Sequence, residues 1–183
     1  ANYLRWLLPT YPGTRVVLVT SRISLARALQ ALCEQNGLGC VNYLGEGVTA
    51  AALRDARLVI VQLDSICKLV PPASRGGVPV VADVVLLDES ESTLFHFHAR
   101  TLQRATDVWQ TFKLLCRRAS QLLLLDAFLG ARSQDFLRSV SGEHALVAAG
   151  RNEVLARELG APPSGPRIWV NLERTETKRY VLH

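Results

Sequence analysis

Two adjacent carboxylates, Asp88 and Glu89, follow the apolar run VVLL at 84–87. A short run of this kind predicts a buried strand, so both carboxylates are expected at the end of a rigid element. In phosphoryl-transfer enzymes, an Asp in this place holds Mg²⁺ through its hydration shell, and a neighbouring Glu polarises the attacking water. Many α/β proteins also end a strand in Asp-Glu, so the pair alone does not establish this chemistry.

Polar residues follow three other apolar runs in the same way. They are Thr20, Ser21 and Arg22 after the run VVLV at 16–19, Gln62, Asp64 and Ser65 around the end of 56–63, and Asp126 after LLLL at 122–125. Hydroxyl, amide and guanidinium groups suit contacts with phosphate and sugar, which position a nucleic-acid strand without reading its sequence. Each group also has a structural alternative, as a helix cap, a strand-to-helix turn or a solvated helix start.

The elements that must position these residues alternate between strands and helices. Strands are predicted at 15–20, 39–44, 56–63, 81–89, 121–127, 144–150 and 167–173. Helices are predicted between Ser21, as a cap, and Gly37, at 48–55 with Thr49 as a cap, and at 92–119, 131–140 and 151–160. In the first of these helices the apolar face is expected to contain Ile23, Leu25, Ala28, Leu29 and Leu32.

Near-continuous apolar strands separated by helices predict an α/β fold with a three-layer parallel sheet. Ligands of such sheets bind beyond the carboxyl ends of the strands. The sequence therefore predicts that Thr20, Gln62, Asp88 and Asp126 lie together at one edge of the sheet.

Composition narrows the class of protein. A length of 183 residues, 49% of them hydrophobic, is enough for one domain, or for one domain and a small extension. The net charge of +5 is compatible with an anionic partner. No apolar run reaches the roughly 18 residues that span a bilayer, so no membrane partner is expected. None of the four cysteines forms a CxxC pair, which favours reduced thiols in an intracellular protein. His96 and His98 lack further ligands at zinc-site spacing, and Trp109, Phe112 and Leu115 follow the spacing of a core-facing helix stripe.

Several blocks occur in an order that resembles the replication origin-binding protein family, which includes herpesvirus origin-binding helicases and relatives in large DNA viruses and some protists. The blocks are VLVTSRISLARAL (17–29), YLG (43–45), VIVQLDSICKL (59–69), VVLLDESESTL (84–94) and LLLLDAFL (122–129). The resemblance covers about residues 13–140. It implies a superfamily 2, DEAD/DEAH-type helicase, with a RecA-like P-loop motor domain at 1–150. Residues 151–183 would then form a linker or begin the second helicase domain.

The resemblance also implies roles for individual residues. Asp88 and Glu89 would be catalytic and, with Glu91, would bind ATP, with Asp88 holding Mg²⁺ through water. Contacts with single-stranded DNA would come from Thr20, Ser21, Arg22, Gln62, Asp64 and Ser65. Asp126 and Ala127 would couple the ATP site to the DNA path. The implied protein is an ATP-dependent DNA helicase that binds replication origins in the nucleus or a viral replication compartment, as a homo-oligomer or with replisome proteins.

One motif of the family is missing from the sequence. No GxxxxGK[ST] phosphate-binding loop occurs, and residues 2–9 are expected to be the tail of the helix that follows such a loop. The sequence also contains no Met, which favours the interpretation that it is an internal piece of a longer protein. We therefore expect the 183 residues alone to be inactive as an ATPase. The alternative is a non-catalytic binding or scaffold module derived from a helicase motor. A Rossmann or flavodoxin fold is disfavoured, because no Gly-rich turn follows the first strand.

Overall fold

A computed structural model describes residues 2–70, 81–126, 130–141, 146–149 and 167–172. Its centre is a seven-stranded sheet in the order β2-β3-β1-β4-β5-β7-β6, with every neighbouring pair parallel. The strands are β1 (Val16–Thr20), β2 (Val41–Asn42), β3 (Leu58–Gln62), β4 (Val84–Asp88), β5 (Gln121–Asp126), β6 (Leu146–Ala149) and β7 (Arg167–Leu172). All seven strands predicted from the sequence are therefore confirmed, along with the parallel α/β architecture.

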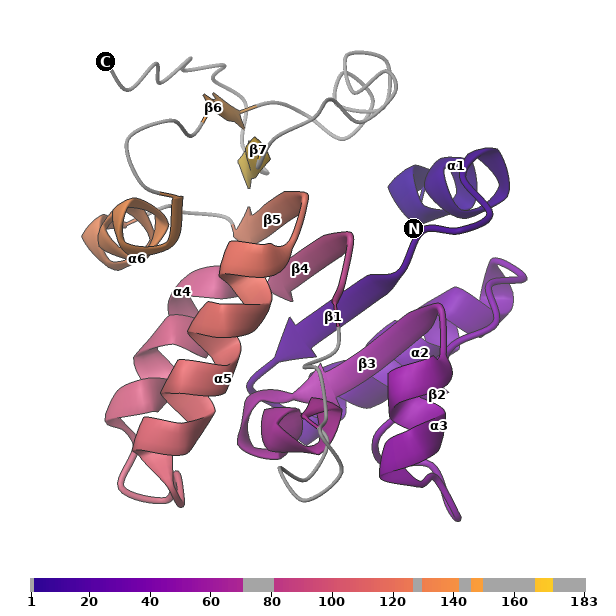
Figure 1. Cartoon of the computed structure of the whole chain (residues 1–183), viewed down its shortest axis with the longest axis horizontal. Coiled ribbons are helices and arrows are strands. Elements are labelled where there is room, and N and C mark those ends of the chain that lie inside the picture. Colours follow the sequence, from indigo (N-terminus) through magenta and orange to yellow (C-terminus); the bar gives the residue numbers. More distant parts are fainter. Residues whose placement is uncertain (1, 71–80, 127–129, 142–145, 150–166, 173–183) are drawn as a thin grey trace.

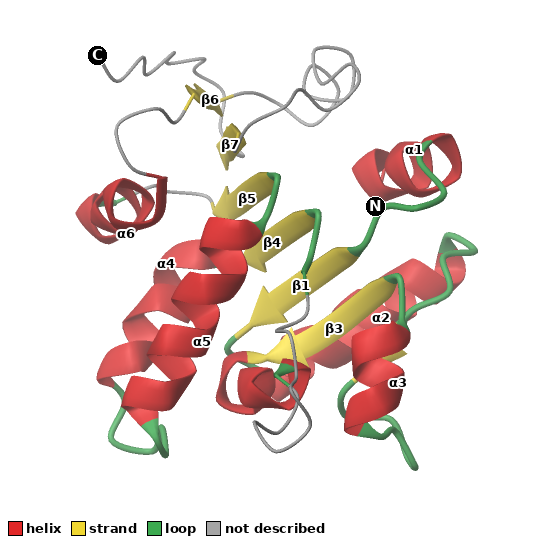
Figure 2. Cartoon of the chain, viewed as in Figure 1, coloured by secondary structure: helices red, strands yellow, loops and turns green. Residues whose placement is uncertain are grey.

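Helices cover both faces of this sheet (Figures 1 and 2). They are α1 (Asn2–Thr10), α2 (Ile23–Gln35), α3 (Ala50–Asp55), α4 (Ser90–Phe95), α5 (Ala105–Arg118) and α6 (Ala131–Ser141), with 3₁₀ helices η1 (Leu63–Leu69) and η3 (His96–His98). The predicted helix tail at 2–9 falls within α1. The predicted helix at 151–160 and the loop at 71–79 lie outside the described residues.

Two apolar cores result from the alternation of side chains along the strands. Val17 and Val19 of β1 point into a core that includes α5, α6, α3 and η1. Val16 and Leu18 point into the opposite core, which α1 and α2 cover. Burial on both faces is the reason that these strands are apolar throughout rather than alternating.

The prediction for α2 was wrong in two details. Arg22, not Ser21, is its N-terminal boundary, and no side chain there makes a capping hydrogen bond. The face that packs on the sheet contains Ala26, Leu29 and Cys33, whereas Ile23 and Leu32 are exposed. Thr49 does cap α3, because its hydroxyl accepts from the Ala52 amide at 3.1 Å.

The predicted continuous helix at 92–119 was also wrong, because the chain breaks between α4 and α5. After η3, Arg104 adopts the left-handed conformation (φ 55°), which a right-handed helix cannot contain, and α5 begins at the next residue. Within α5 the predicted core stripe is confirmed: Phe112 and Leu115 are buried, and Trp109 packs against them from a partly buried position.

Phe112 lies at the centre of the core under α5, with no exposed surface and ring contacts to Phe97 at 5.5 Å and Phe136 at 5.0 Å. We expect Phe112→Ala to lower the free energy of unfolding by about 3–5 kcal/mol, because the substitution leaves a cavity among rigid neighbours. Leu114→Ala on the exposed side of the same helix should cost less than about 1 kcal/mol. Urea denaturation of both variants measures the difference; equal losses would contradict this account of the core.

Candidate functional site

The predicted strand-end residues lie at one edge of the sheet. Thr20 of β1 is paired in register with Gln62 of β3. Val19 is paired with Leu87, so Asp88 lies one step beyond it on β4. Asp88 is paired with Leu125, which places Asp126 one step further along β5. The sheet thus brings four polar side chains to the carboxyl ends of adjacent strands, as the sequence predicted.

The backbone turns sharply at the end of β4. Glu89 is in the left-handed conformation (φ 49°, ψ 57°), which costs a non-glycine residue about 1–3 kcal/mol. The Glu89 amide donates to Asp88 Oδ1 at 3.2 Å, which holds the turn. The turn separates the two carboxylates: Asp88 belongs to the strand, whereas the Glu89 side chain is 46% exposed.

Asp126 holds the start of α4 from the neighbouring strand. Its Oδ2 accepts from the Glu91 amide at 2.8 Å and from the hydroxyl of buried Ser90 at 3.5 Å. Amides in the first turn of a helix have no acceptor within the helix, so a carboxylate there both satisfies them and meets the positive end of the helix dipole. The structural alternative, that Asp126 acts as a helix cap, is thus realised on α4 rather than on a helix that follows β5.

Glu91 holds the start of α6 in the same way. Its Oε1 accepts from the amides of Gly130 at 2.8 Å and Ser133 at 3.0 Å, and its Oε2 lies 3.1 Å from Arg132 Nη1. Partial burial alone would raise the pKa of this carboxyl. The hydrogen bonds from Ser133 and Gly130 and the charge of Arg132 outweigh burial and lower its pKa below the ordinary value. Glu91, predicted as part of the nucleotide site, is therefore engaged with α6.

The polar ends of β1 and β3 are tied to each other. Thr20 is fully buried and its hydroxyl accepts from the Arg22 amide at 3.3 Å. Gln62 Nε2 donates to the carbonyl of Ser21 at 2.9 Å, and Gln62 Oε1 accepts from the Tyr43 hydroxyl. Burial, and secondarily the nearby Asp64 charge, raises the pKa of Tyr43, so this hydroxyl stays protonated as a donor.

Two further contacts complete the edge. Arg22 Nη1 lies 3.7 Å from Glu89 Oε2, and Arg22 Nη2 lies 3.5 Å from the Ser92 hydroxyl. Asp64 Oδ1 lies 2.7 Å from His96 Nε2. Ser65 follows Asp64 in η1 and is partly exposed. Ala127 lies outside the described residues. Sequence patterns did not indicate Arg132, Ser133 or His96 as partners, because each contact joins segments far apart in the chain.

Among the described residues, no group of three or more His, Cys, Asp and Glu side chains is placed to hold a metal ion directly. Nor does any helix in those ranges have the length and apolarity to cross a membrane.

Glu91→Gln removes the charge but keeps an acceptor, so we expect a loss of about 1 kcal/mol in the free energy of unfolding at pH 7. The folded pKa of Glu91 is lowered, so the charged group stabilises the fold above the unfolded pKa of about 4.3, and this contribution disappears as the pH falls through the folded pKa. Urea titrations of both proteins between pH 7 and 3 should therefore converge at the acidic end. Glu46→Gln, at an exposed loop position, should match the parent protein throughout; a pH-independent gap for Glu91→Gln would contradict the assignment.

Comparison with known proteins identifies the family of the chain. The family model described as "Origin of replication binding protein" matches residues 1–155. The chain is 29% identical over 143 residues to the replication origin-binding protein of Human herpesvirus 2 (strain HG52), an alignment that covers 76% of this chain. No solved structure matches. The chain spans 16% of the length of that curated relative. Because the family model covers most of the chain, including every strand end described above, the chain belongs to the origin of replication binding protein family.

Proposed function

We propose that the chain is part of the first motor domain of an ATP-dependent DNA helicase that acts at replication origins. The observation that carries the proposal is the shared edge of the sheet. There Asp88 and Glu89 lie beside the polar ends of β1 and β3, and the Arg22–Glu89 ion pair connects the two groups. The name of the herpesvirus relative and the family match support a role in DNA replication. Such a protein would work in the nucleus or a viral replication compartment.

The nucleotide side of the proposal rests on Asp88 and Glu89. Carboxylate oxygens are the ligands that Mg²⁺ prefers, and Mg²⁺ keeps several of its waters, so a single strand-end carboxylate suits a water-mediated contact. Mg²⁺ would neutralise charge on the ATP phosphates when bound. Glu89 is displaced from the strand by its left-handed backbone and exposed, which suits a base that orients water rather than a ligand. Because the 183 residues contain no GxxxxGK[ST], a phosphate-binding loop would have to come from another part of the protein.

The nucleic-acid side divides into exposed and buried residues. Thr20 and Ser21 are buried and hydrogen-bonded within the fold, so they position the strand ends rather than touch DNA. Arg22 is exposed, and Gln62 and Ser65 are partly exposed. We assign the main phosphate contact to Arg22 and the supporting polar contacts to Gln62 and Ser65. These groups recognise the backbone, so little sequence preference is expected.

A form of the protein long enough to contain a phosphate-binding loop should hydrolyse Mg-ATP, and Asp88→Asn or Glu89→Gln should each lower its kcat by about 100-fold or more. The 183-residue chain alone should show only background hydrolysis. Asp55→Asn is the matched control and should leave kcat unchanged, because Asp55 is exposed at the end of α3, close to where β3 begins and therefore at the opposite edge of the sheet. Hydrolysis that survives both strand-end substitutions would overturn the assigned roles.

Arg22 and Glu89 should have opposite effects on DNA binding. Arg22→Gln should weaken binding of a single-stranded oligonucleotide roughly two- to fivefold and reduce the salt dependence slightly, because one phosphate contact is lost. Glu89→Gln should tighten binding by a similar or smaller factor, because the carboxylate no longer competes with phosphate for Arg22. Fluorescence anisotropy at two salt concentrations measures both effects.

Arg118→Gln provides the matched control for charge. Arg118 is exposed at the end of α5, close to where β5 begins and therefore at the opposite edge of the sheet, so its loss should change affinity little. Absence of binding even at low salt would favour the non-catalytic scaffold. Equal losses for Arg22→Gln and Arg118→Gln would show that binding is diffuse and does not use the strand ends.

A further inference from the structure

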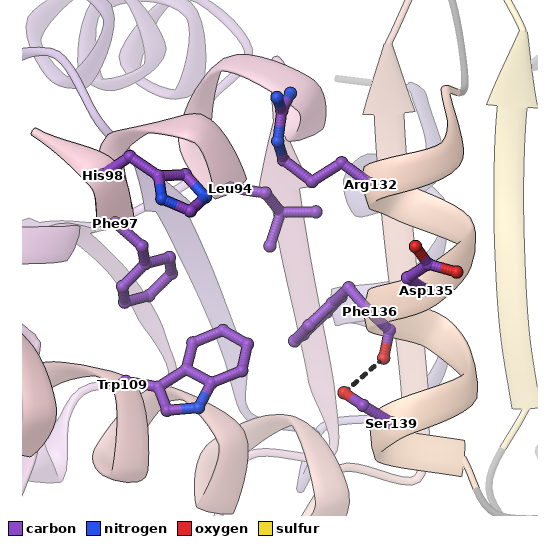
Figure 3. A pocket seen from close by; sticks show the side chains of 8 residues that line it. All are labelled: Leu94, Phe97, His98, Trp109, Arg132, Asp135, Phe136 and Ser139. Atoms are coloured by element: carbon purple, nitrogen blue, oxygen red, sulfur yellow. Dashed lines mark hydrogen bonds between the residues drawn. The ribbon is translucent and has the colours of Figure 1, made fainter.

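A pocket of about 580 Å³ lies in the helical layer, between the Leu94–His98 segment, α5 and α6 (Figure 3). Its walls are the rings of Phe97, Trp109 and Phe136, which face a common space in the close-up view. Phe97 and Trp109 meet edge to face at 4.8 Å, and Trp109 lies 6.0 Å from Phe136. Phe112, fully buried, contacts all three rings from below. The walls are therefore fixed by core packing.

The rim of this pocket is mainly basic. Arg132 and His98 line one side, and the Lys113 ammonium lies 5.5 Å from the centre of the Trp109 ring. Asp135 is the one acidic lining residue, and it pairs with Arg138 at 3.0 Å. The Arg132 side chain is 41% exposed although it touches Glu91, and its guanidinium stacks on Phe95, itself 59% exposed, at 5.0 Å. A guanidinium has five N–H donors, so Arg132 can hold a second carboxylate beside Glu91.

We propose that this pocket docks a short segment of a partner protein that presents an aromatic side chain next to acidic residues. Large aromatic side chains inserted into preformed pockets are the usual anchors of protein interfaces, and edge-to-face packing with Phe97 and Trp109 would orient such a ring. Charge complementarity with Arg132, Arg138 and Lys113 selects acidic neighbours for the anchor. The proposal does not depend on the helicase assignment, because the pocket lies on the helical layer rather than at the edge of the sheet.

Docking here would also affect the strand-end segment Asp88–Glu91. Arg132 is shared between the pocket and Glu91, and Glu91 holds the amides at the start of α6. An acidic segment that draws Arg132 toward the pocket would weaken its contact with Glu91, two residues beyond Glu89. Only the effect of this change on ATP turnover rests on the proposed function.

The test uses the 183-residue chain with ¹⁵N-labelled tryptophan and an unlabelled nine-residue peptide with a central Trp between Asp residues. We expect saturable shifts of the Trp109 indole N–H signal, with no comparable shift of the Trp6 signal from the opposite face of the sheet. A peptide with Ala in place of Trp should bind at least about tenfold more weakly, because the anchor is lost. A peptide with Lys in place of Asp should also bind more weakly.

Two substitutions test the pocket itself. Ser139→Phe should fill it from within and weaken binding by about tenfold, provided that circular dichroism shows an intact fold. Arg132→Gln should weaken the acidic peptide about threefold, whereas Arg27→Gln, exposed on α2, should not. Equal binding of the Asp and Lys peptides would overturn the charge assignment. Trp109 shifts caused only by free indole-3-acetate, by an oligothymidine or by self-association of the chain would overturn the partner-protein assignment in favour of a metabolite, DNA or a second copy.

Discussion

Two carboxylates, Asp126 at the end of β5 and Glu91 in α4, hold the helices on which the candidate site depends. The first amides of a helix need acceptors, yet the residue before α4, Glu89, makes no capping hydrogen bond with its side chain. Asp126 at the end of β5 supplies the acceptor, and Glu91 in α4 then supplies one to the start of α6. Each element is thus fixed by the next, and the arrangement exists only when β4 and β5 are paired in the observed register.

This arrangement gives the residues of the segment Asp88–Glu91 different roles. Ser90 is buried between Asp126 and Ser133, and Glu91 is bound to α6, so both stabilise the fold. Glu89 lies between the strand and these two residues. Its side chain faces solvent and Arg22. The contact with α6 also explains Gly130, where a Cβ atom would come within 3.1 Å of the Glu91 carboxylate. A side chain at this position would push the Glu91 carboxylate away from the amides that donate hydrogen bonds to it.

The sequence predicted the strands well because a doubly covered parallel strand must be apolar along its whole length, and few other segments of this chain are. The same logic correctly placed Thr20, Gln62, Asp88 and Asp126 at one edge. The break before α5 was missed, because the left-handed conformation of Arg104 has no glycine to indicate it. The partners of Glu91 and Asp64 were missed for a different reason: Arg132 and His96 are 41 and 32 residues away, and no local pattern encodes such contacts.

The order of strands has a consequence for how the chain is made. The first strand, β1, is flanked by β3 and β4 rather than by β2, which follows it. As the chain leaves the ribosome, at roughly 5–20 residues per second, Val16–Thr20 must stay unpaired for seconds until these later strands emerge. A bare β-branched segment of this kind is prone to pair with other nascent chains. Arg15 and Arg22, which flank it, place a positive charge near each end, and repulsion between like charges on two such chains opposes that association.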